Sequence, residues 1–232
     1  NLKATKRLVL AFEKAGVDII ELGVPFSDPM SDGPVIQEAS FCALNKNTQL
    51  KDIIRLVRSL RRNCKIPLLL MTYYNPVFSY GEDKFIKDCR SSGVDGVIIP
   101  DLSFEESIGL RRKSYSAGIH NIAFISPVTS KKRMEYIGRR AKGFIYYVAL
   151  TGVTGMRKKM SPGLEKDVKF IKKITSTPVC VGFGVSNRVQ VRRLCRVADG
   201  VIVGSAIVAK IKDNLGSPAL INNVSGFVKG LR

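Results

Sequence analysis

Short apolar runs alternate with amphipathic stretches along the whole chain. The runs suit strands buried on both faces, and the stretches between them space apolar residues at helical period. This pattern predicts strands over residues 17–24, 66–74, 94–101, 121–127, 143–150, 178–185 and 200–205. Regular alternation of strand and helix indicates a parallel sheet with right-handed crossovers, which leaves a doubly wound sheet or a (β/α)8 TIM barrel.

Helices are expected in the segments that separate these runs. Apolar residues recur at helical spacing in TQLKDIIRLVRSLRR, DKFIKDCRSSG, EESIGLRRKSYSAG, KKRMEYIGRRA and NRVQVRRLCRVA. Glycine follows several of them, as in KAGVDIIELG and SSGVDGVIIP, where a left-handed residue ends a helix. We predict one α/β domain over residues 1–232.

The strand count is seven, and the sequence opens on a helix at residues 3–15. A barrel that lacks one strand has two open edges, which folded proteins avoid. We therefore expect the sequence to be incomplete at its N-terminus, with one strand before Asn1 in the natural chain.

Glycines after the last two runs favour the barrel over the doubly wound sheet. The segments are GFGVSN at 182–187 and VGSAIV at 203–208, and each leads into a helix. Barrel enzymes often bind phosphate with the loops after their last two strands and a helix N-terminus. Either glycine-containing segment alone is a weak signal. The two together predict a phosphate site to which Ser205 adds a hydroxyl.

An acidic residue interrupts the first apolar run in ELGVPFSDPMSDGP. Alternation puts Ile20, Leu22 and Val24 on one face of this strand and Glu21 on the other, toward the barrel mouth. Burial raises the pKa of a carboxyl, which suits a general acid or base at neutral pH. The alternative is a structural role for all three acids. Glu21 would then be a buried acid with its hydrogen bonds satisfied, and Asp28 and Asp32 would cap turns or a helix.

Composition narrows the class of protein further. The chain has 232 residues, 45% of them hydrophobic, and a formal net charge of +19. The basic residues lie at helical spacing without interleaved aromatic residues, so we expect solvated helix faces and no nucleic-acid partner. No run approaches the length of a membrane span, and five cysteines with one histidine form no metal-ligand pattern. We expect a cytoplasmic protein with no membrane partner and no metal.

Six segments together resemble the tryptophan synthase α subunit family. They are ELGVPFSDPMSDGPVIQ, LLLMTYYNPVFSYG, VIIPDLSFEE, YYVALTGVTG, VGFGVS and GSAIV. The resemblance implies a (β/α)8 TIM barrel whose first strand precedes the equivalent of Asn1. It implies retro-aldol cleavage of indole-3-glycerol phosphate to indole and glyceraldehyde 3-phosphate. It also implies no cofactor in this subunit and transfer of indole to a pyridoxal-phosphate-dependent β subunit in an α2β2 heterotetramer.

The resemblance assigns roles to particular positions. Glu21 matches the catalytic acid/base, Asp32 the carboxylate that binds the indole N–H, and Tyr146 a tyrosine near the reacting hydroxyl. The other matches are phosphate binding at Gly155, Gly184, Gly204 and Ser205; the indole pocket at Met71, Tyr73, Ile125, Val148 and Phe183; the lid at Thr154; and the partner interface at Pro25 and Asp28. Barrel filling alone would also explain the apolar positions.

The segment 151–166 is rich in glycine and lysine and has no strand pattern. We expect it to be a lid that excludes water from the substrate. Two departures from the family are Leu150, where some members have arginine, and the strong basicity.

Two other functions are compatible with a barrel of this kind. One is a subunit that has kept the fold and acts only as an allosteric activator of its β partner. The other is a different phosphosugar barrel enzyme, such as indole-glycerol-phosphate synthase. That enzyme needs a catalytic lysine on a strand, and no strand run here contains lysine.

Overall fold

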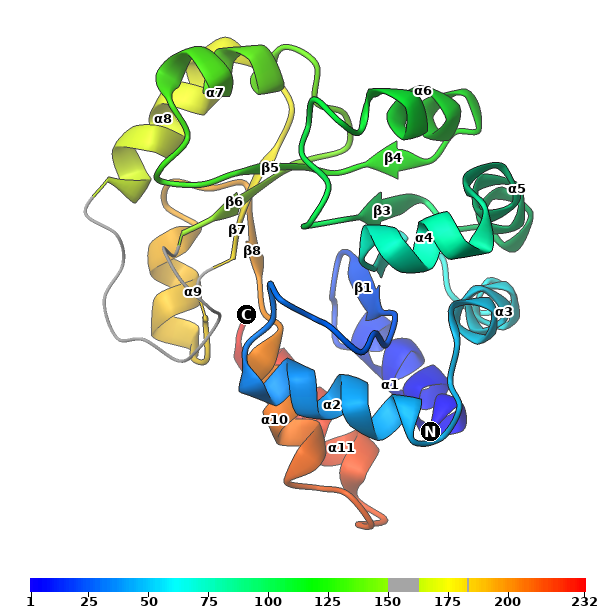
Figure 1. Ribbon diagram of the computed structural model, residues 1–232. Coiled ribbons are helices and arrows are strands. Elements are labelled where there is room, and N and C mark those ends of the chain that lie inside the picture. Colours follow the sequence, from blue (N-terminus) through cyan, green and yellow to red (C-terminus); the bar gives the residue numbers. More distant parts are fainter. Residues whose placement is uncertain (150–162, 183) are drawn as a thin grey trace.

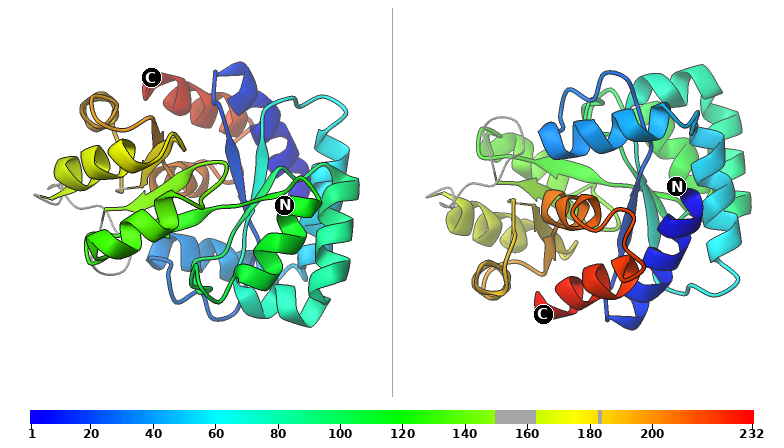
Figure 2. Two further views of the ribbon diagram at one scale, coloured as in Figure 1. Left: turned by 90° about the horizontal axis from the view of Figure 1, so that it is seen from above. Right: turned by 90° about the horizontal axis from the view of Figure 1, so that it is seen from below.

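Helices surround a set of short parallel strands in the computed structural model of the chain (Figure 1). Two further views show the same arrangement, with the strands inside and the helices outside (Figure 2). The structure describes residues 1–149, 163–182 and 184–232. No helix in these residues is long and apolar enough to cross a membrane.

The strands form two parallel sheets of four, in the orders β1-β2-β3-β4 and β5-β6-β7-β8. Their bounds are β1 Ile20–Gly23, β2 Leu68–Met71, β3 Gly96–Ile98, β4 His120–Asn121, β5 Ala123–Ile125, β6 Ile145–Val148, β7 Val179–Gly182 and β8 Gly200–Ile202. Within each sheet, every strand pairs in parallel with the next along the chain, as expected when helices make right-handed crossovers. This succession confirms the predicted barrel-type order.

One extended segment joins the two sheets, because β4 and β5 are separated by a single residue. β4 pairs with β3, and β5 pairs with β6. Ile122 between them donates its N–H to the carbonyl oxygen of Val97 at 2.9 Å. The predicted strand 121–127 is thus divided between two sheets, and the eight labelled strands occupy the seven predicted positions. No pairing joins β1 to β8 among the described residues, and a strand before Asn1 stays a prediction.

Eleven helices lie within the described part of the chain. Their bounds are α1 Leu2–Lys14, α2 Pro34–Leu44, α3 Leu50–Leu60, α4 Tyr74–Tyr80, α5 Glu82–Ser92, α6 Ile108–Ser116, α7 Lys131–Gly138, α8 Leu164–Ile174, α9 Arg188–Leu194, α10 Ser205–Lys212 and α11 Leu220–Gly230. The first and last helices, α1 and α11, pack against each other, and α10 contacts α2 (Figure 2).

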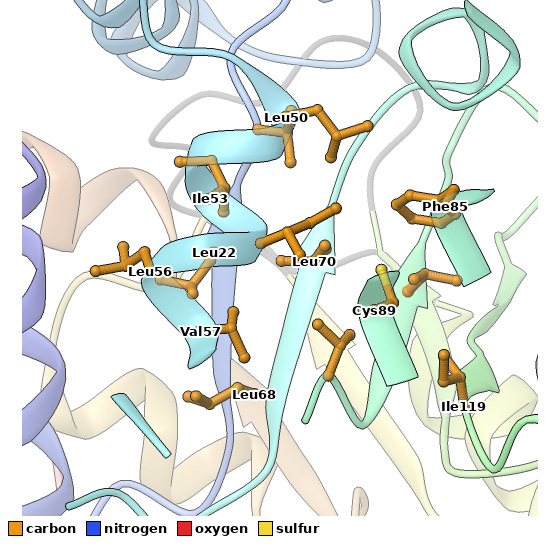
Figure 3. Close-up of a cluster of buried hydrophobic side chains, with 14 of the residues drawn as sticks. Leu22, Leu50, Ile53, Leu56, Val57, Leu68, Leu70, Phe85, Cys89 and Ile119 are labelled. Atoms are coloured by element: carbon orange, nitrogen blue, oxygen red, sulfur yellow. The ribbon is translucent and has the colours of Figure 1, made fainter. Parts of the chain in front are cut away.

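Helix α3 shows how the amphipathic pattern builds the outer core. Its apolar residues face the sheet, and Val57 and Leu60 are fully buried. They pack on the outward side chains of β1 and β2, among them Leu22 and Leu70 (Figure 3). At the start of the helix, the Asp52 carboxylate accepts the Gln49 N–H at 3.0 Å, which satisfies a free amide.

A second outer core and a separate inner core complete the packing. The second outer core lies between the strands β5–β7 and the helices α7 and α8, and includes Ile145, Val179 and Ile171. The inner core has its own residues: Leu69, Ile98, Ile122 and Phe144, with Met71, Phe124, Tyr146, Cys180 and Ile202 packed against them. Strand alternation therefore sends one set of side chains to the helices and the other to the barrel interior.

The second predicted strand is longer than the observed one. It ends at Met71 rather than residue 74, and Tyr74 begins α4. The Asp101 carboxylate, in the loop after β3, accepts the Tyr74 N–H at 2.9 Å and so caps this helix. Pro76 lies in the first turn, where its missing N–H costs nothing. The cap comes from a distant loop, so the local pattern did not predict it.

Candidate active site

Glu21 lies in the middle of β1 with its side chain toward the barrel interior. It pairs in register with Leu69 of β2, which belongs to the inner core. Its neighbours Ile20 and Leu22 belong to the outer core, on the opposite face of the strand. The period of two residues thus places a carboxyl group among apolar side chains, on the predicted face of the strand.

Burial controls the ionisation of Glu21. No hydrogen bond to its carboxyl group is present among the described residues, and desolvation raises its pKa from 4.5 to about 7. The charged form of an acid is disfavoured when no donor or cation replaces its water. At neutral pH, this carboxyl group can therefore both give and take a proton.

Asp32 lies in the loop that connects β1 to α2. Its carboxylate accepts a hydrogen bond of 2.8 Å from the Tyr73 hydroxyl. Burial raises the pKa of Asp32, and the hydrogen bond from Tyr73 opposes that rise. The Gln37 side chain donates to the Asp32 carbonyl oxygen at 2.9 Å, which holds the loop to the first turn of α2.

Tyr146 lies on β6 and faces the same interior. Burial raises its pKa far above the ordinary value, and the negative charges of Glu21 and Asp32 raise it further. The hydroxyl therefore keeps its proton at neutral pH and can act as a hydrogen-bond donor. Its ring packs against Phe124 with the centroids 5.0 Å apart. The carboxyl groups of Glu21 and Asp32 therefore lie close enough to Tyr146 to affect the ionisation of its hydroxyl.

Gly182 on β7 leaves the space that the Tyr146 ring occupies. The sequence pattern does not predict this role of Gly182. A Cβ at this position would lie 2.6 Å from Cε1 and 2.7 Å from the hydroxyl oxygen of Tyr146. Only glycine leaves room for the ring there, because such distances are far inside van der Waals contact. Gly182 is the first glycine of GFGVSN, a segment predicted to bind phosphate, and a glycine at the end of a buried strand is the signal that could have indicated it.

Gly182→Ala is expected to lower kcat about tenfold, because the methyl group must displace the Tyr146 ring from the interior. Steady-state kinetics would measure this loss. Gly226→Ala on α11 is the matched control, since its Cβ would meet open space. An unchanged kcat in Gly182→Ala, with the control also unchanged, would show that the position of Tyr146 is not critical.

The predicted phosphate residues follow two neighbouring strands. Gly184 comes after β7 and has φ of 55°, a left-handed conformation that glycine adopts without strain. Gly204 precedes α10, and Ser205 is its first residue. Because Gly182 of β7 pairs with Ile202 of β8, both loops leave the barrel at the same end. Helix α10 therefore presents its N-terminal amides at this end.

The predicted indole-pocket residues divide between two faces. Met71 packs on the inner core, Val148 shares the inward face of β6 with Tyr146, and Tyr73 reaches Asp32. Ile125 does not join them, because it is buried in the outer core with Ile145 and Tyr147. Its inward neighbour is Phe124. Sequence periodicity could have indicated Phe124 and also Cys180, which faces the interior from β7.

Some predicted positions lie outside the described residues. They are Thr154 and Gly155, Phe183 and, among the departures from the family, Leu150. Of the predicted lid 151–166, the structure describes Gly163 and the first turn of α8 from Leu164. Pro25 is half-buried and Asp28 is exposed in the loop after β1.

On the rest of the described surface, a further site would need a depression or a group of metal-binding side chains. Two shallow depressions lie between α1 and α3 and beside α7, and none of the predicted site residues lines either. In residues 1–149, 163–182 and 184–232, no group of three or more His, Cys, Asp or Glu side chains could hold a metal ion. The acids at the barrel interior are the most developed chemical site among the described residues.

Strand order, inward-facing acids and two glycine loops at one end define a class of protein. Parallel β/α barrels place their reacting groups at the carboxyl ends of the strands. The chain is accordingly a β/α-barrel enzyme.

Comparison with known proteins narrows the class to one family. A model described as "Tryptophan synthase alpha chain" matches residues 1–225. A tryptophan synthase alpha chain from Geotalea uraniireducens (strain Rf4) is 45% identical over 232 residues, which cover 100% of this chain and 86% of the relative. One from Thermoanaerobacter sp. (strain X514) is 41% identical, with 100% of this chain and 88% of the relative covered.

Solved structures agree. The tryptophan synthase subunit alpha from Legionella pneumophila str. Paris superposes with a TM-score of 0.88 at 33% identity, covering 99% of this chain and 86% of that one. The chain belongs to the tryptophan synthase alpha chain family. It is a lyase subunit of tryptophan biosynthesis, and the family reaction is the cleavage of indole-3-glycerol phosphate.

Proposed function

We propose that Glu21, Asp32 and Tyr146 carry out this cleavage as a retro-aldol reaction at the inward face of the barrel. The observation that supports it most is the placement of Glu21, a carboxyl group in an apolar interior with a pKa of about 7. The products are indole and glyceraldehyde 3-phosphate. No other group is needed to balance the reaction, because one proton moves from the glycerol hydroxyl to the indole ring.

Glu21 handles the proton in both halves of the reaction. In its protonated form, it helps to protonate C3 of the indole ring, which gives an indolenine. Its carboxylate then takes the proton of the glycerol 3-hydroxyl while the C–C bond breaks and the electron pair returns to the ring. A pKa near neutrality serves both steps, because neither protonation state is rare.

Asp32 stabilises the indolenine intermediate, and Tyr146 contacts the reacting hydroxyl group. Positive charge develops on the indole nitrogen of the indolenine, and the Asp32 carboxylate accepts the N–H there. Carboxylates act strongly on such charge when water is excluded, and Asp32 is already partly desolvated. Tyr146 remains protonated and donates a hydrogen bond near the reacting hydroxyl.

The substrate phosphate binds between the loops after β7 and β8. Gly184 lets the backbone turn toward the anion, and Gly204 leaves space in front of α10 because a Cβ there would meet nothing within 4 Å. The first amides of α10 and the Ser205 hydroxyl face the phosphate oxygens. The proposal also assigns Gly155 to the phosphate site, Thr154 to the lid and Phe183 to the indole pocket.

A β subunit covers the mouth of the barrel and receives the indole, and it holds the pyridoxal phosphate. Apolar side chains support a docking surface, since Met30, Phe78, Ile108 and Val128 are each more than half exposed. These residues lie in segments that follow β1, β2, β3 and β5. The loop that holds Pro25 and Asp28 also holds Asp32, so a partner bound to it would affect the site.

The test is an assay of the purified chain with indole-3-glycerol phosphate, alone and with a β subunit. We expect indole and glyceraldehyde 3-phosphate in equal amounts from the chain alone, and faster formation in the complex. The absence of indole under both conditions would overturn the proposal. Stimulation of the β reaction by a chain that itself releases no indole would favour the allosteric activator instead.

A further inference from the structure

The hydroxyl group of Tyr73, in the short segment between β2 and α4, connects this segment to the loop after β1. It donates to the Asp32 carboxylate at 2.8 Å and accepts the Ser31 N–H at 3.1 Å. We propose that Tyr73 is a positioning residue that acts on the substrate through Asp32, rather than only a wall of the indole pocket. This inference rests on the proposed role of Asp32.

The direction of the two hydrogen bonds follows from the donors available. The Ser31 N–H can only donate, so it occupies a lone pair of the Tyr73 oxygen. The phenolic proton is then directed to Asp32, where it meets a carboxylate oxygen. Burial raises the pKa of Tyr73 far above its ordinary value, and the Asp32 charge adds to the effect. The hydroxyl therefore keeps its proton and remains a donor at any working pH.

Tyr73 is itself firmly held, which a positioning group must be. Its side chain is buried, and its ring lies 5.5 Å from that of Phe26, centroid to centroid. The Ser40 hydroxyl of α2 accepts the Phe26 N–H at 2.9 Å and donates to the Phe26 carbonyl oxygen at 3.0 Å. The loop after β1 is thus attached to α2 near its start and to Tyr73 near its end.

The orientation of the Asp32 carboxylate depends on the hydrogen bond from Tyr73, because Asp32 lies in a loop. The loop contains two prolines and no strand or helix, so no regular element orients the carboxylate. The described contacts give its side chain one hydrogen-bond donor, Tyr73. A donor that fixes one carboxylate oxygen leaves the other oriented for a substrate N–H. Pre-orientation of this kind accelerates the chemical step because the geometry is set before reaction.

A double-mutant cycle between Tyr73 and Asp32 tests the inference. Tyr73→Phe keeps the ring and its packing and removes the hydroxyl. We expect kcat to fall about tenfold with KM changed less than about twofold, as for the loss of one hydrogen bond to a charged group. Asp32→Ala removes the acceptor completely, which asparagine would not. In the Asp32→Ala background, Tyr73→Phe should change kcat less than about twofold.

Tyr74→Phe is the matched control. Tyr74 is the next residue, and its hydroxyl donates to the Glu82 carboxylate at 2.9 Å on the outside of the barrel. It should leave kcat and KM unchanged, and thermal unfolding should show all variants folded.

The outcomes separate the inference from the function on which it rests. The same tenfold loss in both backgrounds would overturn the inference, because Tyr73 would then act independently of Asp32. An unchanged kcat in Tyr73→Phe would also overturn it, and both results leave the proposed function intact. A wild-type kcat in Asp32→Ala would overturn the proposed role of Asp32 itself.

Discussion

Glu21→Gln is expected to lower the rate of indole formation about 10³-fold, within the range for loss of a general acid/base. Glutamine keeps the size and shape of the side chain but can neither give nor take the proton at indole C3 and the glycerol hydroxyl. Binding should change little, because the amide fits the same apolar surroundings. Single-turnover kinetics with saturating indole-3-glycerol phosphate would measure the chemical step directly.

The same substitution is expected to stabilise the folded protein at alkaline pH. The pKa of Glu21 is raised from 4.5 to about 7, so the folded state resists its ionisation. Stability from the neutral carboxyl is fully present below pH 4.5 and is lost as the pH rises through 7. The shift from 4.5 to about 7 corresponds to at most about 3 kcal/mol, and water that reaches the group reduces this free energy. Glu21→Gln should therefore unfold later than wild type at pH 8 and at the same point at pH 4.

Glu13→Gln provides a control of opposite sign. The Glu13 carboxylate accepts the Lys65 N–H at 2.7 Å, and this bond lowers its pKa. Its stabilisation is present above the unfolded pKa and is lost as the pH falls through the folded one. We expect Glu13→Gln to lose stability at pH 8 and keep full activity. Normal turnover in Glu21→Gln would remove Glu21 from the mechanism, and a loss of stability at pH 8 would mean that Glu21 is a satisfied structural acid.

Strand alternation was enough to predict the most important feature of the site. In β1, the apolar residues Ile20 and Leu22 face the helices, and this alone sends Glu21 inward. The order of strands was also predictable, because amphipathic segments between buried runs permit few topologies. Both features depend on the spacing of apolar residues within single strands and helices, and this spacing can be read directly from the sequence.

Features that depend on distant contacts were not predictable. The cap on α4 comes from Asp101, 27 residues further along the chain. The fit of Gly182 against Tyr146 appears only when β6 and β7 pair. Ile125 was predicted in the pocket by resemblance, whereas strand phase places Phe124 inward and Ile125 in the outer core. Periodicity and resemblance disagreed there, and the structure follows periodicity.

Asp32→Asn is expected to lower kcat about 10²-fold, the second largest effect after Glu21→Gln. Asparagine can still accept the Tyr73 hydrogen bond through its amide oxygen, so the loop should keep its attachment. It has no charge to stabilise the positive indole nitrogen of the indolenine. Because that charge is absent from the bound substrate and forms in the transition state, the loss should appear in kcat more than in KM.

Glu38→Gln separates this effect from a general change in charge. Glu38 lies on α2, close in sequence to Asp32, and its exposed carboxylate pairs with Lys212 at 2.7 Å. Solvent and salt screen such a pair, so its removal should leave kcat unchanged. An equal loss in both variants would mean that net charge matters rather than the carboxylate at Asp32. A rise in KM with kcat unchanged in Asp32→Asn would place Asp32 in substrate binding alone, because stabilisation of the developing charge must lower the barrier from bound substrate to transition state.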